Sequence, residues 1–307
     1  MIRGSVFGSR REKELFTSLH TQWGSQFDLW PSLPFALIVD ASSLGPNFRE
    51  SERDFFLKTS VDYTLCTKRG QPVLSIEFDG LGKGFSRQGE YVQQTATVDP
   101  YRKLKMDLKL RIAQNEAYSF FVVSFQESVI LDRATNLTIV DGIIGQVLAK
   151  KEFKKSTETL YDDYREIIEA LPPTAQYDYV QDLVLDAETI AELKWDPIAK
   201  LAAKLEYEAF EKGVVKSYGT EYLNDPELPD GDPYDFSVLE KRVEAMKNAV
   251  RVGCRITAKT PENSIVETVW LRNFEDTMVS ALHIASNIAE LLAFRRALDS
   301  AASWNAT

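Results

Sequence analysis

Cysteine and histidine are scarce in this chain, whose 307 residues contain two of each. The cysteines, Cys66 and Cys254, are too few for a disulfide framework, and two histidines are too few for a histidine-rich metal site. No apolar run approaches the roughly 20 residues that a membrane-spanning helix needs, and the N-terminal segment has no hydrophobic stretch of the signal-peptide kind. The sequence therefore predicts a cytoplasmic protein that does not enter a membrane.

Charge is distributed unevenly along the chain. The composition, 44% hydrophobic and 27% charged, is that of a globular protein with a large core. Residues 1–131 contain 16 Lys/Arg and 15 Asp/Glu, a net charge of +1, whereas residues 132–307 contain 20 and 31, a net charge of −11. The acidic second half argues against a protein that coats nucleic acid over its whole surface, but a local basic groove in the first half is compatible with it. We therefore expect a domain at 1–131 and a second region with a different role at 132–307.

The first region has the pattern of an α/β domain. Apolar residues recur at helical spacing in some segments and alternate with polar residues in others. The expected elements are a helix at 10–23 that Ser9 precedes as its cap, an extended piece within 27–40, a hairpin of strands at 61–67 and 73–80, a glycine-bearing loop at 81–98, a helix at 99–115 and a strand at 119–125. This order is typical of a mixed sheet flanked by helices.

The second region is expected to be mainly helical and carries no catalytic motif. Its segment 224–235 contains five acids and three prolines and is expected to be a solvated connector. We expect this region to mediate self-association, to bind a protein partner or to act as a substrate clamp. The expected elements are helices near 137–150, 154–171, 187–212 (interrupted at Asp196-Pro197) and 236–247, a hairpin of strands at 250–256 and 264–271, and a helix at 276–301.

Three carboxylates fall on the first predicted hairpin. Asp62 lies on its first strand, and Glu77 and Asp79, two residues apart, point to the same face of its second strand. An antiparallel hairpin that turns near residues 69–71 places Asp62 roughly opposite Glu77. Unpaired carboxylates are costly in such apolar strands, so they need a cation or a basic partner. Hard divalent ions such as Mg²⁺ prefer carboxylate oxygens and retain water, so the hairpin is a candidate metal site.

Basic side chains follow this hairpin directly, in the loop and in the next helix. A carboxylate cluster beside basic residues suits phosphodiester hydrolysis, because a metal activates water, a lysine steadies it and other cations hold the phosphates. Acids and lysines at such spacing are also often surface ion pairs of little energetic consequence. The basic residues are Lys83, Arg87, Arg102, Lys103, Lys105, Lys109 and Arg111.

The order of these segments resembles the PD-(D/E)XK nuclease superfamily, and within it the very-short-patch-repair-like branch and uncharacterised restriction-endonuclease-like domains. The resemblance covers about residues 8–127 and implies a restriction-endonuclease-like α/β fold, with a mixed sheet flanked by helices. The segments that carry it are Ser-Arg-Arg-Glu-Lys-Glu-Leu-Phe from residue 9, Val-Asp-Tyr-Thr-Leu from residue 61, Ser-Ile-Glu-Phe-Asp-Gly from residue 75 and Asp-Pro-Tyr-Arg-Lys from residue 99.

The resemblance also implies roles for the acids. Asp62 and Glu77 would be catalytic and would bind Mg²⁺ or Mn²⁺ with help from Asp79. Glu12, on the first helix, would be a supporting acid.

The resemblance places the catalytic lysine on the helix that follows the loop. Asp79 occupies the position where the superfamily usually has its lysine, so this role would pass to Lys103 or Lys105. The residues expected to contact the nucleic-acid backbone are Lys83, Arg87, Arg102 and Lys109.

We therefore expect a metal-dependent nuclease that hydrolyses phosphodiester bonds of nucleic acid, with DNA favoured over RNA. The Asp-Gly pair is not followed by the histidine that this branch commonly has. A catalytically inactive nuclease-like fold that acts as an interaction or structural subunit is therefore an alternative. A weaker alternative is a toxin-like effector whose partner supplies the affinity for nucleic acid, because the chain itself is acidic.

Overall fold

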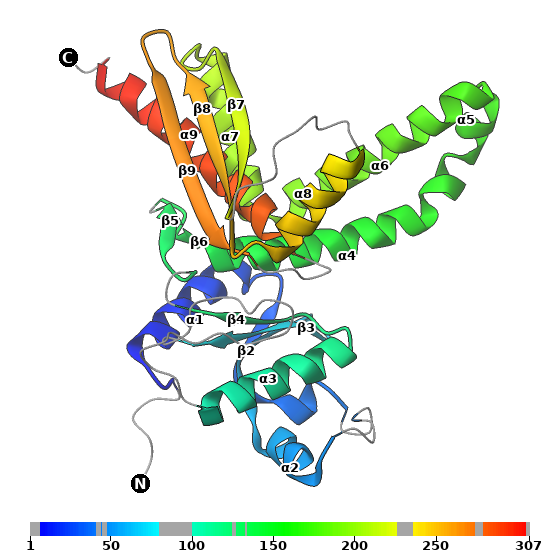
Figure 1. Ribbon diagram of the computed structural model, residues 1–307, viewed down its shortest axis with the longest axis vertical. Coiled ribbons are helices and arrows are strands. Elements are labelled where there is room, and N and C mark those ends of the chain that lie inside the picture. Colours follow the sequence, from blue (N-terminus) through cyan, green and yellow to red (C-terminus); the bar gives the residue numbers. More distant parts are fainter. Residues whose placement is uncertain are drawn as a thin grey trace. The chain divides into compact units, whose positions relative to one another are not determined.

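The protein is a mixed α/β structure with two compact units, drawn as ribbons in Figure 1. The first unit contains the described residues up to Val140 and the second those from Asp141 onwards, and each is described by itself. All structural statements concern the residues that the computed structural model describes, which are 7–40, 44, 48–79, 100–124, 127–132, 134–225, 236–273 and 279–304.

The first unit contains a four-stranded sheet in the order β1-β2-β3-β4. The first three strands are antiparallel, and β4 is parallel to β3. A parallel pair needs a crossover connection, which α3 supplies. The expected mixed sheet flanked by helices is thus confirmed. The elements are α1 (Arg10–Trp23), β1 (Asp28–Pro34), the 3₁₀ helix η1 (Phe35–Leu37), α2 (Glu50–Lys58), β2 (Ser60–Cys66), β3 (Pro72–Phe78), α3 (Pro100–Asn115), β4 (Phe120–Val123), β5 (Ile130–Asp132) and β6 (Leu137–Thr138).

Helix α1 has the cap and the apolar stripe that its sequence predicts. The Ser9 hydroxyl accepts a hydrogen bond from the Glu12 amide (3.1 Å), which caps the first turn. The Phe16 ring lies 6.2 Å from the ring of Tyr63 in β2, so the helix packs on the sheet. The buried side chains, four residues apart on one face, are Leu15, Leu19 and Trp23.

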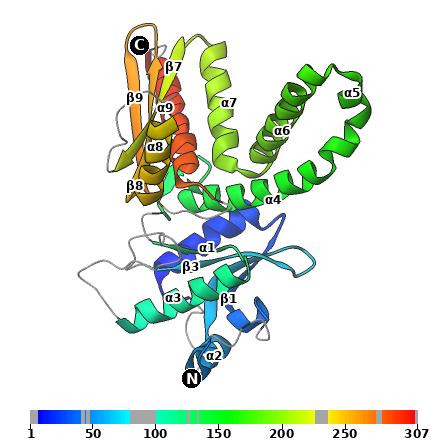
Figure 2. The same ribbon diagram turned by 45° about the vertical axis from the view of Figure 1, so that its right-hand side comes forward.

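Helices α1 and α3 lie on opposite faces of this sheet (Figures 1 and 2). Tyr63 of β2 pairs with Ile76 of β3, and its hydroxyl donates to the Glu12 carbonyl of α1 (2.8 Å). Glu77 follows Ile76 and therefore points to the other face, where Lys109 of α3 contacts it. The strand alternation thus places an apolar face under α1 and the acids under α3.

Several elements of the first unit were not predicted from the sequence as such, among them β1 and α2. Strand β1 contains Pro31 and Pro34, which are tolerated because β1 lies at an edge of this sheet, where it pairs with β2 alone among the described strands. Helix α2 is short and charged, and Phe56 is its buried residue. The Glu52 carboxylate accepts a hydrogen bond from the Arg49 amide (2.8 Å), which stabilises the first turn.

A hydrophobic core joins η1, α2, α3 and β4. Phe35 is completely buried in it, with its ring centroid 5.6 Å from that of Phe56 and 5.7 Å from that of Phe120. Aromatic packing of this kind fixes η1 and α2 against the sheet. Other buried members are Val39, Leu44, Phe48, Val61, Met106, Leu108, Leu110, Ile112, Ala113 and Val122.

The short β5–β6 hairpin also belongs to the first unit. Its turn is tied to α1, because the Ser18 hydroxyl donates to the Asn136 carbonyl (3.2 Å). The first unit therefore ends at Val140, whereas the expected domain ended at residue 131.

The second unit is mainly helical around a three-stranded antiparallel sheet in the order β7-β8-β9. Helix α9 packs on this sheet, with the ring centroids of Phe294 and Tyr218 5.2 Å apart. None of the described helices combines the length and the apolarity needed to cross a membrane. The elements are α4 (Ile139–Asp163), α5 (Arg165–Ala170), α6 (Pro173–Trp195), α7 (Pro197–Glu211), β7 (Ser217–Asp225), α8 (Phe236–Asn248), β8 (Arg251–Lys259), β9 (Ser264–Arg272) and α9 (Ala281–Trp304).

The helix ends in this unit differ from those the pattern predicted. The helix expected at 137–150 continues to Asp163, because residues 151–163 contain no proline or glycine. Helix α6 begins at Pro173 rather than near residue 187. The expected break at Asp196-Pro197 is confirmed, and proline occupies the first turn of α7. Strand β7 is mostly exposed and polar, and it was not predicted.

Asp196 holds the junction between α6 and α7. Its Oδ1 accepts hydrogen bonds from the Ile198 amide (2.9 Å) and the Ala199 amide (3.2 Å). Gly145 of α4 lies so close that a Cβ atom there would be 2.6 Å from the Asp196 Cα. Burial raises the pKa of Asp196 to about 7, and the negative charge of Glu192 adds to the rise.

The Asp196→Asn variant is expected to lose part of the pH dependence of stability. An unfolded aspartate has a pKa of about 3.9, so the contribution of this group to stability is complete below that pH and is lost as the pH rises to about 7. Asparagine keeps the cap but does not titrate. Urea unfolding at about pH 5 and pH 8 should show a smaller fall in the free energy of unfolding for the variant than for the wild type. An equal fall would contradict the assignment.

Candidate functional site

Asp62, Glu77 and Lys109 come together between the first sheet and α3. Glu77 Oε1 accepts a hydrogen bond from Lys109 Nζ at 2.7 Å, and the same ammonium donates to the Ser60 carbonyl at 2.8 Å. Asp62 Oδ2 accepts a hydrogen bond from the Phe78 amide at 2.8 Å. One further step of the β2–β3 register places Asp62 opposite Glu77. Two carboxylates and one ammonium, from three elements, therefore share one small region.

Burial dominates the electrostatics of this group. It raises the pKa of Asp62 to about 7, and the nearby Glu77 charge adds to the rise, while the Phe78 amide and Lys109 oppose it. Burial also raises the pKa of Glu77, against the opposing effect of the Lys109 ammonium. Neighbouring buried carboxyls resist ionising together. An additional cation beside them would therefore favour both ionised forms.

The other two predicted acids lie in different settings. Asp79 is completely buried and forms an ion pair with Arg102 of α3. The Glu12 carboxylate accepts a hydrogen bond from the Gly8 amide at 2.6 Å. Glu12 affects Asp62 through its charge alone, as a minor contribution to the raised pKa. Asp79 therefore belongs to the buried site by its position, whereas Glu12 lies at its margin.

The lysine that enters the site is Lys109, whereas the sequence pointed to Lys103 or Lys105. Lys103 is exposed and pairs with Asp107 one turn further along α3 (2.7 Å), and Lys105 is exposed as well. Lys109 is only 5% exposed, which is rare for a lysine. A signal for it exists in the sequence, because Lys109 interrupts the apolar stripe of α3. The stripe contains Met106, Leu110 and Ala113.

The residues expected to contact the nucleic-acid backbone divide into two groups. Arg102 and Lys109 instead contact the buried acids Asp79 and Glu77. Lys83 and Arg87 lie outside the described residues.

One buried oxygen of the acid pair lacks a hydrogen-bond partner within the described residues, namely Glu77 Oε2. This oxygen and the Asp62 carboxylate are the hard donors that Mg²⁺ or Mn²⁺ prefers. In the described part of the chain, no three His, Cys, Asp or Glu side chains form a group that could hold a metal. Asp62 and Glu77 could therefore supply two carboxylate ligands to such an ion, and water would have to supply the others.

A chain of hydroxyl groups continues the polar face beside Glu77, and the sequence analysis did not single it out. Thr64 Oγ1 and Ser75 Oγ are 2.9 Å apart, and Ser75 Oγ is 2.8 Å from the Tyr118 hydroxyl. Ser75 lies two residues before Glu77 and shares its face of the strand. This chain satisfies buried hydroxyl groups and supports the strand that carries Glu77.

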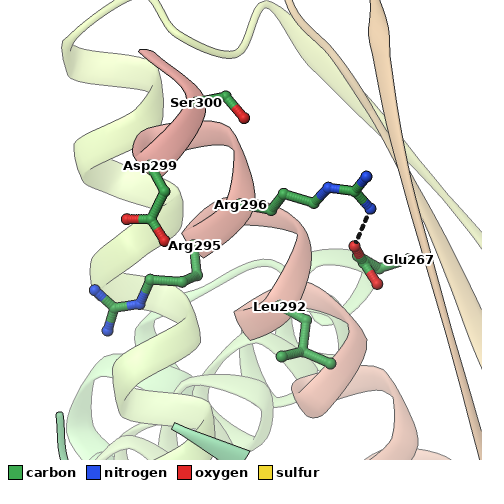
Figure 3. A pocket seen from close by; sticks show the side chains of 6 residues that line it. All are labelled: Glu267, Leu292, Arg295, Arg296, Asp299 and Ser300. Carbon is green, nitrogen blue, oxygen red and sulfur yellow. Dashed lines mark hydrogen bonds and ion pairs between the residues drawn. The ribbon is translucent and has the colours of Figure 1, made fainter. Parts of the chain in front are cut away.

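An open hollow on α9 in the second unit is a weaker candidate (Figure 3). Its volume is about 430 Å³. Arg296 and Glu267 form an ion pair in it at 2.7 Å. Its two arginines are balanced by two acids, so its lining has no net charge with which to attract an anion. The lining residues are Glu267, Leu292, Arg295, Arg296, Asp299 and Ser300.

The chain matches no protein-family model, no curated protein and no solved structure.

Proposed function

We propose that the first unit is a metal-dependent nuclease domain of the PD-(D/E)XK type, which hydrolyses phosphodiester bonds of nucleic acid, with DNA favoured. The observation that carries the proposal is the buried group of Asp62, Glu77 and Lys109. The order of elements supports it, with a helix, three antiparallel strands, a crossover helix and a parallel fourth strand. This order agrees with the mixed sheet flanked by helices that the sequence predicts.

In the proposed site, Asp62 and Glu77 would hold Mg²⁺ or Mn²⁺. When bound, the ion supplies an activated water and offsets the charge that develops on the phosphate. Lys109 favours the ionised form of Glu77, because its ammonium is 2.7 Å from the carboxylate. The exposed Lys103 and Lys105 of α3 would provide positive charge for the nucleic-acid backbone.

One observation favours a second candidate, an inactive nuclease-like fold that acts as an interaction or structural subunit. Glu77 and Asp79 are each paired with a basic side chain, Lys109 and Arg102. In an inactive protein these ion pairs would persist when a divalent ion is added, because no ion would bind to the carboxylates. Metal binding therefore separates the two candidates.

We expect Glu77→Gln and Asp62→Asn each to lower Mg²⁺-dependent cleavage by roughly 100-fold or more, because each removes a metal-binding charge. Glutamine is preferred to alanine because it keeps the volume of Glu77 and an acceptor for Lys109. Cleavage of plasmid DNA, single-stranded DNA and RNA would be measured with Mg²⁺ and with Mn²⁺. The control is Glu116→Gln, which removes an exposed acid that follows α3.

Calorimetric titration with Mg²⁺ or Mn²⁺ completes the test. Specific binding by the wild type that both variants lose would support the metal site. Wild-type cleavage that persists in Glu77→Gln would contradict the proposed mechanism. A folded wild type that binds neither ion and cleaves no substrate would favour the interaction subunit.

A further inference from the structure

The outer half of α4, with α5 and α6, forms a helical arm over residues 150–194 of the second unit. Figures 1 and 2 both show this arm projecting away from α9 and the three-stranded sheet of the same unit. All residues of the arm are described, and only Ile168 and Ala191 are buried. The arm therefore buries very little of its own surface, although it spans 45 residues.

The arm exposes large apolar side chains to an unusual degree. Tyr177 is 70% exposed and Ile190 is 67% exposed. Helix α6 is 23 residues long, and large apolar side chains exposed on a helix are normally covered, because such a surface is costly in water. Further exposed members are Tyr161, Ile167, Leu185 and Leu193. These side chains require a cover that the described chain does not supply.

The arm also carries two sets of opposite charges that are unpaired within it. Asp178, Asp182 and Asp186 recur every four residues on α6, so they form an acidic row along one side of the helix. Lys154 and Lys155 lie on the outer half of α4. Within the described residues, none of these five side chains forms an ion pair. Like charges at this spacing repel one another, so a basic partner opposite the acidic row would be stabilising.

Two ion pairs join α4 to α6 at the base of the arm. Lys150 is 3.7 Å from Glu188, and Lys194 is 2.6 Å from Glu152. The acidic row and the two lysines lie further along the arm, towards α5. The outer part of the arm therefore has both charged and apolar groups available for a partner.

We propose that a second copy of this chain covers the arm, and that the two arms pair about a two-fold axis into a four-helix arrangement. A two-fold contact uses the same surface on both chains. The acidic row on α6 of each chain therefore faces the lysines on α4 of the other chain. Such a contact would place the acidic row beside two lysines and would cover apolar side chains of both arms. A helix of 23 residues is about 35 Å long, which suits a helical bundle.

The test uses charge reversal at exposed positions of the full chain. One variant is Asp182→Lys with Asp186→Lys, and the other is Lys154→Glu with Lys155→Glu. Each variant places like charges opposite one another at both contacts of a homodimer, so we expect association to weaken by roughly 100-fold or more. When the two variants are mixed, opposite charges face each other at both contacts, and a heterodimer should form.

Analytical ultracentrifugation gives the mass of each species, with circular dichroism to show that each variant is folded. The matched control is Glu211→Lys, an exposed reversal at the end of α7 outside the arm. A wild-type dimer, two monomeric variants and a restored heterodimer on mixing would establish the contact. A wild type that is monomeric at about 100 µM would overturn the proposal. So would variants that remain dimeric, or a mixture that remains monomeric.

Discussion

Replacing Lys109 by methionine is expected to lower the free energy of unfolding by about 3–5 kcal/mol near pH 7.5. Methionine matches the length of the side chain, but it removes the ammonium that lies 2.7 Å from Glu77. Glu77 is buried, so its carboxylate would be left in a poorly solvated site without a cation. The Ser60 carbonyl would also lose its hydrogen bond from the ammonium.

Urea unfolding measures this change, and two further variants isolate its cause. Lys105→Met, an exposed substitution on the same helix, should change stability by less than about 0.5 kcal/mol. The double variant Lys109→Met with Glu77→Leu should recover much of the loss, because it removes the buried charge together with its partner. The penalty should also shrink at lower pH, where Glu77, whose pKa burial raises, takes up a proton. A loss of equal size in the double variant would argue against the ion pair as the cause.

Replacing Phe35 by alanine is expected to lower the free energy of unfolding by about 3–5 kcal/mol. The Phe35 side chain is completely buried, and its ring packs on those of Phe56 and Phe120. Alanine would leave a cavity at the point where η1, α2 and β4 meet. The aromatic contacts would be lost along with the buried apolar area.

The control for this prediction lies two residues away. Leu37 belongs to the same 3₁₀ helix but is 70% exposed, so Leu37→Ala should be nearly neutral. Denaturant unfolding of both variants gives the comparison, with far-ultraviolet circular dichroism of the native states as a check on the fold. Similar losses for Phe35→Ala and Leu37→Ala would show that the core is not centred on Phe35.

Local patterns in the sequence predicted much of the first unit. The cap at Ser9 and the apolar spacing gave α1 its observed limits, and alternation around the turn at Gly70 gave the β2–β3 hairpin. The hairpin register then brought Asp62 opposite Glu77. These features depend on residues that are close in sequence or on a short turn. The spacing of apolar residues and the turn residues are therefore enough to predict them.

The lysine of the site could not be chosen in this way. Lys103, Lys105 and Lys109 all lie on α3, and the rotation of a helix about its axis decides which of them faces the sheet. That rotation follows from the packing of Met106 and Leu110 into the core, which turns Lys109 inwards and leaves the other two in solvent. Strand β1 was not predicted as such because its prolines are acceptable only at a sheet edge.

By itself, then, the sequence determined α1, the β2–β3 hairpin and the pair of acids on it, because hydrogen-bonding pattern and side-chain alternation act over short distances. Only the tertiary structure decided that Lys109 partners Glu77, that Arg102 partners Asp79, and that the arm of α4, α5 and α6 is exposed. These outcomes depend on which surfaces are buried against one another, and burial is set by contacts between residues far apart in the chain.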